Sequence, residues 1–284
     1  MISTELEFQA PEKLPEVLSL LRQYGSDAKL LAGGMSLIPM MTLGLLHPER
    51  IISLNHVADL DYVRDDGRVL RIGALTRHAT IRSHALIRQH APLLAEAAGF
   101  IGDPQVRNRG TLGGSLAHAD PAADYLPVVI ALGAQFKLQK ASGERSVDAK
   151  DFFRDLMTTA LTDDELLTEV TVPKLAPGSG SSYQRLHRVE GNFAIVAAAA
   201  IVEPGFRGAR IALGGVGPKP VLFDVGARLG KGATEAALAG IGDDAYAASG
   251  DAYGDLNGDA AYRRAMARVY ARRVATTAAA QVKK

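Results

Sequence analysis

Apolar residues in the first 175 positions recur at two spacings, one typical of helices and one typical of buried strands. Over residues 14–24 they repeat every three or four positions, which predicts an amphipathic helix that ends at Gly25. Short runs with several apolar residues over residues 28–31 and 165–172 predict strands instead, the first of them buried. The pairs Asp66-Gly67 and Ser142-Gly143 each separate two such runs and predict hairpins.

The pattern changes at residues 175–182, LAPGSGSS, which carry Pro, Gly and Ser without apolar periodicity. We place a domain boundary in this linker. Beyond it the sequence predicts antiparallel strands over residues 183–188, 193–203 and 208–216, a short helix over residues 234–238 and a long helix in the tail. We expect the tail arginines, Arg263 among them, to form a solvated face and the last residues, AAAQVKK, to fray.

A polar, turn-rich segment lies between two apolar stretches at residues 107–127, RNRGTLGGSLAHADPAADYLP, and is predicted to be a loop. Gly113 and Gly114 lack side chains, so their backbone N–H groups can approach a ligand closely and adopt positive φ. The hydroxyls of Thr111 and Ser115 flank this pair. Such an arrangement is typical of an anion cradle.

A second segment, LAGGMSLIPMM at residues 31–41, has the same character, with Gly33 and Gly34 before the hydroxyl of Ser36. Two glycine-pair segments in one chain favour a phosphate-rich ligand, such as a dinucleotide, that is held at two points. Neither segment has the GxGxxG or GxxxxGK[ST] spacing, so the Rossmann and P-loop fingerprints do not apply. An ordinary turn is the alternative for each segment taken alone.

Three polar side chains, His118, Asp120 and Asp124, follow the second glycine pair. The two carboxylates could accept hydrogen bonds from hydroxyls such as those of a ribose. The three side chains could instead bind a hard or borderline metal ion, but the glycine pair would then have no role, so we favour the nucleotide interpretation. Three further histidines, beginning with His78, recur every six residues, a spacing that does not bring them together on a helix. We expect them on the surface.

Composition narrows the classes of function. The 284 residues are 47% hydrophobic and 22% charged, which is ordinary for a globular protein of one large or two modest domains. A net charge of +1 and the absence of Trp argue against a nucleic-acid-binding surface. The absence of cysteine excludes iron–sulfur clusters held by cysteines of this chain, so any cluster must belong to a partner. No apolar run approaches the roughly 20 residues of a membrane span, and no signal core is present, so we expect a cytoplasmic protein.

Four phrases together resemble the FAD-binding medium subunit of molybdenum hydroxylases, the carbon monoxide dehydrogenase medium-subunit group related to the flavin domain of xanthine dehydrogenase. They are LLAGGMSLIPMM, LLAEAAGFIGDPQVRNRGTLGGSLAHADPAAD, FFRDLMTTALTDDELLTEVTVP and DLNGDAAYRRAMA. The resemblance implies an α+β fold with an FAD-binding domain of the PCMH or vanillyl-alcohol-oxidase type over residues 1–175, in two lobes of about 1–57 and 58–175. It also implies a smaller α+β domain over residues 178–284, like the CO dehydrogenase flavoprotein C-terminal domain.

The resemblance also implies which residues hold FAD. Residues 32–36 and 111–115 would cradle the pyrophosphate, and Asp124 would bind the ribityl or ribose region. Ile101 and Leu167 would form apolar walls, although both suit a plain core equally well. Arg185 would approach the pyrimidine edge of the isoalloxazine, where a cation stabilises negative charge on the ring; its alternative is a surface strand position. The whole expected set is Leu31, Ala32, Gly33, Gly34, Met35, Ser36, Leu37, Ile101, Thr111, Leu112, Gly113, Gly114, Ser115, Asp124, Leu167 and Arg185.

Two positions, one of them outside this set, depart from the family pattern. Met35 stands where a histidine is expected in close relatives, and Phe193, which matches an aromatic position near the ring, lacks a tyrosine hydroxyl. Both changes are compatible with FAD binding, but each removes a hydrogen bond that the family side chain would make. No catalytic triad and no metal site are expected in this chain.

The implied function is electron transfer. A large partner would carry the molybdenum cofactor, a small partner would carry [2Fe–2S] clusters, and the assembly would be a dimer of heterotrimers. This chain would take electrons onto FAD and pass them to an external acceptor. The alternatives are a stand-alone flavin oxidase or dehydrogenase and, in a different class, a non-catalytic scaffold subunit.

Overall fold

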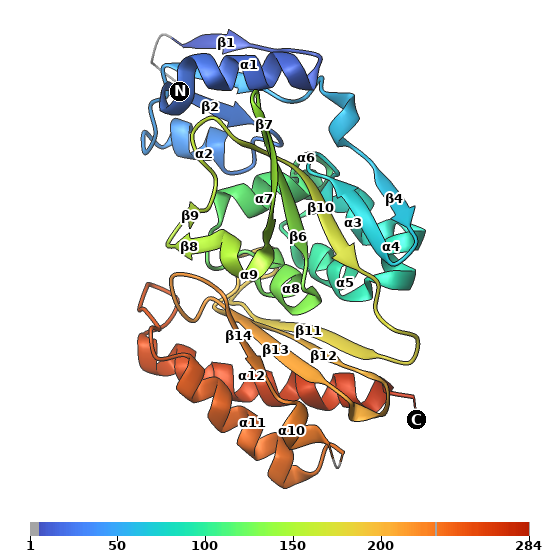
Figure 1. The fold of residues 1–284 in the computed structure, drawn as a ribbon. Helices are drawn as coiled ribbons and strands as arrows, with labels where there is room; N and C mark the ends of the chain where they lie inside the picture. Colours follow the sequence, from blue (N-terminus) through green and yellow to red (C-terminus); the bar gives the residue numbers. More distant parts are fainter. Residues whose placement is uncertain (1–5, 231, 284) are drawn as a thin grey trace.

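The computed structural model describes residues 6–230 and 232–283, in which the three larger sheets and their helices are stacked from the N-terminal to the C-terminal end (Figure 1). The first sheet has the strand order β1-β3-β2, and both strand pairs are parallel. Helix α1 buries Val17, Leu18 and Leu21 against it, as the helical spacing predicts. The elements of this layer are β1 (Glu7–Gln9), α1 (Leu14–Tyr24), β2 (Ala28–Leu31), α2 (Leu37–Thr42) and β3 (Arg50–Ser53).

The second sheet is antiparallel and has the order β4-β5-β10-β6-β7. Helices α3, α4, α5, α7 and α8 share one hydrophobic core with its strands. The strands are β4 (Val63–Asp66), β5 (Val69–Gly73), β6 (Gln135–Lys140), β7 (Gly143–Asp148) and β10 (Leu166–Pro173), with the short pair β8 (Phe153–Asp155) and β9 (Thr158–Thr159) beside them. The helices are α3 (His78–Ser83), α4 (Ala85–His90), α5 (Pro92–Phe100), α6 (Pro104–Arg109), α7 (Leu112–His118), α8 (Tyr125–Leu132) and α9 (Ala149–Phe152).

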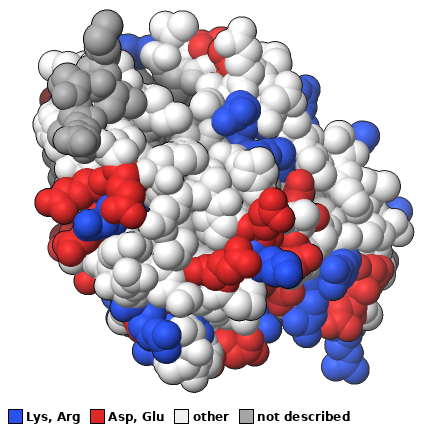
Figure 2. Space-filling view, turned by 90° about the horizontal axis from the view of Figure 1, so that it is seen from above, with Lys and Arg blue, Asp and Glu red and all other residues white. Residues whose placement is uncertain are grey.

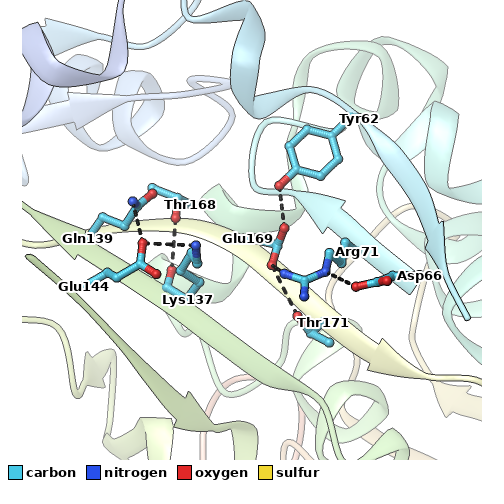
Figure 3. Close-up of polar contacts among 9 residues, drawn as sticks. All are labelled: Tyr62, Asp66, Arg71, Lys137, Gln139, Glu144, Thr168, Glu169 and Thr171. Atoms are coloured by element: carbon cyan, nitrogen blue, oxygen red, sulfur yellow. Dashed lines mark hydrogen bonds and ion pairs between the residues drawn. The ribbon is translucent and has the colours of Figure 1, made fainter. Parts of the chain in front are cut away.

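Glu169 ties the hairpin β4–β5 to the central strand β10 (Figure 3). Its buried carboxylate accepts hydrogen bonds from the Tyr62 hydroxyl at 2.7 Å and from Nη1 of Arg71 at 3.0 Å. The same guanidinium pairs with Asp66 at 2.6 Å through its Nε. Burial and the neighbouring carboxylate raise the pKa of Tyr62, so this hydroxyl remains a donor.

In the third sheet, β11-β12-β13-β14, the inner strands β12 and β13 are buried on both faces. On β12, Val196, Ala198 and Ala200 pack into a core with α11 and α12, whereas the residues between them pack into the core of the second layer. Successive side chains of a strand point to opposite faces, so one continuous apolar run serves two cores. The elements are β11 (Gly180–Leu186), β12 (Val196–Val202), β13 (Ala209–Gly214), β14 (Val221–Asp224), α10 (Gly226–Leu229), α11 (Glu235–Ala248) and α12 (Ala260–Gln281).

The C-terminal helix differs from its sequence prediction in two ways. Arg263 is 1% exposed rather than solvated, because it donates hydrogen bonds to the carbonyl oxygens of Ile195 and Gly215 and pairs with Asp255 at 2.7 Å. The helix is also regular as far as Gln281, although fraying was expected from residue 278 onwards. The side-chain oxygen of Gln281 accepts a hydrogen bond from the backbone of β11 at 3.1 Å. Lys284 lies outside the described residues. The predicted short helix at 234–238 is likewise longer and extends to Ala248.

Charges of both signs are interspersed on the face seen from the N-terminal end (Figure 2), and the net charge of the chain is +1. Surface ion pairs such as Arg50–Glu7 at 2.9 Å contribute to this mixture. Within the described ranges, no helix has both the length and the apolar character needed to cross a bilayer.

Glu165, just before β10, holds an ion pair with a predictable pH dependence. Its side chain is 3% exposed and accepts two hydrogen bonds from Arg145, at 2.6 and 2.7 Å, and one from the Thr162 amide at 3.0 Å. The hydrogen bonds from Arg145 are the main cause that lowers the pKa of Glu165 from 4.5 to about 2. Because the folded-state pKa is the lower one, this contribution to stability is complete above pH 4.5 and is lost as the pH falls towards 2.

We therefore expect Glu165→Gln to lower the free energy of unfolding at neutral pH by about 2 kcal/mol, a value reduced by solvent screening around the half-exposed Arg145. The difference from the unmodified chain should shrink as the pH falls below 4.5. Urea unfolding across this pH range measures both effects. A difference that stays constant down to low pH would show that Glu165 is not the titrating group.

Candidate functional site

A cavity of about 570 Å³ lies where the first layer, the helices of the second layer and the β11–β12 connection meet. Its walls come from residues near both glycine pairs, from the start of β10 and from β11. All of the expected site residues line it except two. Leu31 belongs to the end of β2, and Leu112 is fully buried in the main core at the start of α7.

The two glycine segments, about 80 residues apart in sequence, meet backbone to backbone at Gly33. A Cβ atom at Gly33 would lie 2.3 Å from the carbonyl oxygen of Arg109 and 2.7 Å from Cα of Gly110, so only glycine fits. Gly34 has φ of +76°, a conformation that glycine adopts without strain. The backbone amides of Gly34, Met35 and Ser36 donate to no other group of the described chain and are available to a ligand.

The second glycine segment is not the loop with positive φ that its composition predicts. Residues 112–118 form helix α7, and Thr111 caps it by accepting a hydrogen bond from the Gly114 amide at 3.1 Å. The amide of Gly113 donates to the carbonyl oxygen of Ala74 at 2.7 Å, and a Cβ atom at Gly113 would lie 2.5 Å from that of Ala74. Tertiary packing against Ala74 therefore explains this glycine, and the segment brings its hydroxyls rather than free amides to the cavity.

Asp124, Tyr183 and Arg185 form a buried polar group at one side of the cavity. Nη1 of Arg185 donates to both carboxylate oxygens of Asp124, at 3.0 and 3.1 Å, and the Tyr183 hydroxyl donates to Oδ1 at 2.5 Å. Burial raises the pKa of Asp124, and Arg185 partly offsets this effect. Arg185 is 6% exposed and so is not a surface strand residue.

The guanidinium of Arg185 has only part of its hydrogen bonds made. Its Nε and Nη2 are buried without a hydrogen-bond acceptor among the described residues, and its guanidinium lies 5.3 Å from the centre of the Phe100 ring. Buried donors of this kind are rarely left unpaired in a functional state. A ligand that presents oxygen or nitrogen acceptors in the cavity would pair them. FAD carries such acceptors along its whole length, so the residues present fit this cofactor.

The apolar walls are positioned by their own contacts. Nη1 of Arg107 donates to the carbonyl oxygens of Ile101 and Gly102, at 2.9 and 3.0 Å, which fixes the turn that presents Ile101 to the cavity. Leu167 lies on β10 where the register with β6 shifts. Phe193 is 58% exposed and lines the cavity from the β11–β12 connection.

His78 was missed by the sequence analysis, which placed it on the surface. It is 4% exposed, lines the cavity, and its Nδ1 lies 3.1 Å from the Tyr125 hydroxyl. Burial and the nearby Arg77 and Arg107 lower the pKa of His78 to about 3, so the ring is neutral. The six-residue spacing between the histidines does not indicate that His78 is buried.

The alternative of a metal site at His118, Asp120 and Asp124 finds no support in the geometry. Within the described ranges, no group of three or more His, Asp or Glu side chains is placed to hold a metal ion. Asp124 is instead engaged by Arg185 and Tyr183.

Comparison with known proteins reveals similarity along nearly the whole chain. Residues 4–175 match the family described as the FAD binding domain in molybdopterin dehydrogenase, and residues 181–278 match the CO dehydrogenase flavoprotein C-terminal domain. The chain is 40% identical to the carbon monoxide dehydrogenase medium chain of Hydrogenophaga pseudoflava over 272 residues, which cover 94% of each chain. It is 33% identical to the nicotine 6-hydroxylase medium subunit of Paenarthrobacter nicotinovorans, covering 97% of this chain and 98% of that one.

Solved structures show the same similarity in three dimensions. A carbon monoxide dehydrogenase structure from Hydrogenophaga pseudoflava, which lacks the Mo-pyranopterin moiety of the molybdenum cofactor, aligns with a TM-score of 0.94 at 40% identity and covers 100% of both chains. Quinoline 2-oxidoreductase from Pseudomonas putida 86 aligns with a TM-score of 0.88 at 30% identity, covering 99% of both chains.

Proposed function

Because the chain belongs to the family of FAD-binding medium subunits of molybdenum hydroxylases, we propose that it accepts electrons from an iron–sulfur partner and passes them to an external acceptor. One observation carries this proposal. The two glycine segments and the incompletely paired Arg185 surround a single cavity, although they come from three distant parts of the sequence. FAD supplies the redox chemistry, which no side chain of this cysteine-free chain would provide.

The residues around the cavity take distinct roles in this proposal. The amides of Gly34, Met35 and Ser36 bind phosphate oxygens of FAD, and Ser115 adds a hydroxyl from the second glycine segment. Ile101 and Leu167 exclude water from the ring, and Arg185 places its positive charge where negative charge develops on reduction. Asp124 orients Arg185 through its hydrogen bonds, and the remaining lone pairs of its carboxylate can accept a hydroxyl of the ribityl or ribose region.

The proposed partners are a large subunit with the molybdenum cofactor and a small subunit with [2Fe–2S] clusters, in a cytoplasmic dimer of heterotrimers. The medium-chain relatives of multisubunit dehydrogenases support this assembly, as does the absence of cysteine ligands in the chain. We further propose that the two domains join between residues 175 and 181. The gap between the two family matches and the break between β10 and β11 support this boundary.

The role of this chain does not determine the substrate of the complex. The relatives are named for carbon monoxide, nicotine and caffeine, although their sequences are 33–40% identical to this chain. We propose that substrate choice lies with the large subunit, and that the cavity described here is occupied by FAD and not by the hydroxylated substrate.

Titration of FAD into the purified chain, alone and with its co-purified partners, tests the proposal. We expect flavin absorption bands that remain with this chain through gel filtration, whereas iron–sulfur and molybdenum signals should appear only in the complex. Failure to take up FAD even in the presence of the partners would refute the proposed function. Direct reduction of the FAD-bound chain by an organic substrate, without partners, would favour a stand-alone flavin dehydrogenase instead.

A further inference from the structure

The structure assigns Tyr183 as a positioning residue of the FAD site that acts through Asp124 on Arg185. This inference rests on the proposed function, because it concerns how the chain presents a positive charge to bound FAD. Tyr183 belongs to the C-terminal domain and does not line the cavity. The residue therefore acts at a distance, through hydrogen bonds.

Tyr183 and Arg185 share one face of β11. They are two residues apart in a strand, so their side chains point the same way, towards the helices of the second layer. The Tyr183 ring is 1% exposed and lies 5.8 Å from the ring of Phe100 on α5. Its backbone amide donates to Glu96 of the same helix at 3.0 Å. These contacts hold the tyrosine rigidly against the FAD-binding domain.

Asp124 accepts a hydrogen bond from the Tyr183 hydroxyl, although its position at the start of α8 would suit a helix cap. It occupies the N-cap position of α8, where an aspartate commonly accepts a hydrogen bond from the amides of the first turn. Its side chain makes no such bond and instead accepts from Tyr183 and Arg185. The carboxylate of Asp124, in the FAD-binding domain, therefore accepts hydrogen bonds from two side chains of the C-terminal domain.

The hydroxyl has a specific effect on Arg185. Each hydrogen bond to the buried carboxylate of Asp124 offsets part of the cost of removing that charge from water. Without the Tyr183 hydroxyl, the carboxylate would therefore attract the guanidinium of Arg185 more strongly. Tyr183 shares that role, so Arg185 binds Asp124 through Nη1 alone and keeps Nε and Nη2 unpaired. Burial and the adjacent carboxylate raise the pKa of Tyr183 well above its ordinary value, so it remains a donor throughout the working pH range.

Tyr183→Phe tests the inference, because it removes the hydroxyl and keeps the ring packed against Phe100. In the assembled complex we expect FAD to bind about tenfold more weakly, as for the loss of one hydrogen bond to a charged group. We also expect a lower midpoint potential of the bound flavin, because Arg185 is drawn towards Asp124. Fluorescence titration and spectroelectrochemistry measure the two quantities. Tyr270→Phe, at a buried tyrosine in the other core, should leave both unchanged.

A double-mutant cycle separates positioning from general destabilisation. If Tyr183 acts through Arg185, removal of the hydroxyl in an Arg185→Met background should no longer change FAD affinity or midpoint potential. An effect of equal size in both backgrounds would overturn the inference, and so would an unchanged potential and affinity in Tyr183→Phe alone. Should Tyr183→Phe not fold, Asp124→Asn removes the charge that links Tyr183 to Arg185. We expect this variant to raise the midpoint potential, because Arg185 is released from Asp124, and no shift would count against the inference. Absence of FAD from the unmodified complex would instead refute the proposed function.

Discussion

Replacement of Gly33 by alanine is expected to weaken FAD binding at least about a hundredfold, a loss of roughly 2.7 kcal/mol. The added Cβ atom would lie 2.3 Å from the carbonyl oxygen of Arg109 and 2.9 Å from its carbonyl carbon, and neither backbone atom can move without shifting the start of α7. The two glycine segments would separate, and the free amides that follow Gly33 would lose their position relative to Ser115. FAD titration followed by flavin fluorescence measures the change.

Gly230→Ala is the matched control for this substitution. The atom nearest to a Cβ at Gly230 is 3.6 Å away, and the residue lies beyond α10, far along the chain from either glycine segment. We expect its FAD affinity to equal that of the unmodified chain. Circular dichroism should show that Gly33→Ala retains its secondary structure. Binding of FAD by Gly33→Ala within about threefold of normal would show that the contact of the two segments is not what forms the site.

Arg263→Met is expected to lower the free energy of unfolding by about 3 kcal/mol, because it removes the guanidinium and leaves its partners behind. The buried carbonyl oxygens of Ile195 and Gly215 would lose their donor, and Asp255 would lose its ion pair. Methionine fills much of the same volume, so the loss reports the polar contacts rather than a cavity. Urea unfolding of the chain measures it.

Arg268→Met, on the same helix, controls for the loss of a positive charge. Arg268 is about half exposed and pairs with Asp243 at 2.9 Å on the surface, so its removal should cost no more than about 1 kcal/mol. Equal effects of the two substitutions would mean that the buried contacts of Arg263 contribute little. A much larger effect of Arg263→Met would confirm that this residue holds the β11–β12 connection and the end of β13 against α12.

Local features of the structure were largely predictable. The helix Leu14–Tyr24 and the strand Ala28–Leu31 occur with the expected bounds, and both hairpins form at the Asp-Gly and Ser-Gly pairs. The errors arose where packing overrode composition. The glycine-rich run after Thr111 is a helix because Ala74 and the Thr111 cap support it, and the last turns of α12 do not fray because β11 packs against them.

The family, its cofactor and fourteen residues of the cavity lining could be predicted from the sequence, because short motifs carry the resemblance to the family. The buried pairs His78–Tyr125, Tyr183–Asp124 and Arg263–Gly215 could be identified only from the tertiary structure. Each joins residues at least 47 positions apart, and no periodicity of spacing or residue type links them. Periodicity reports which face of an element is apolar, but the partner that satisfies a buried polar group depends on how distant elements pack.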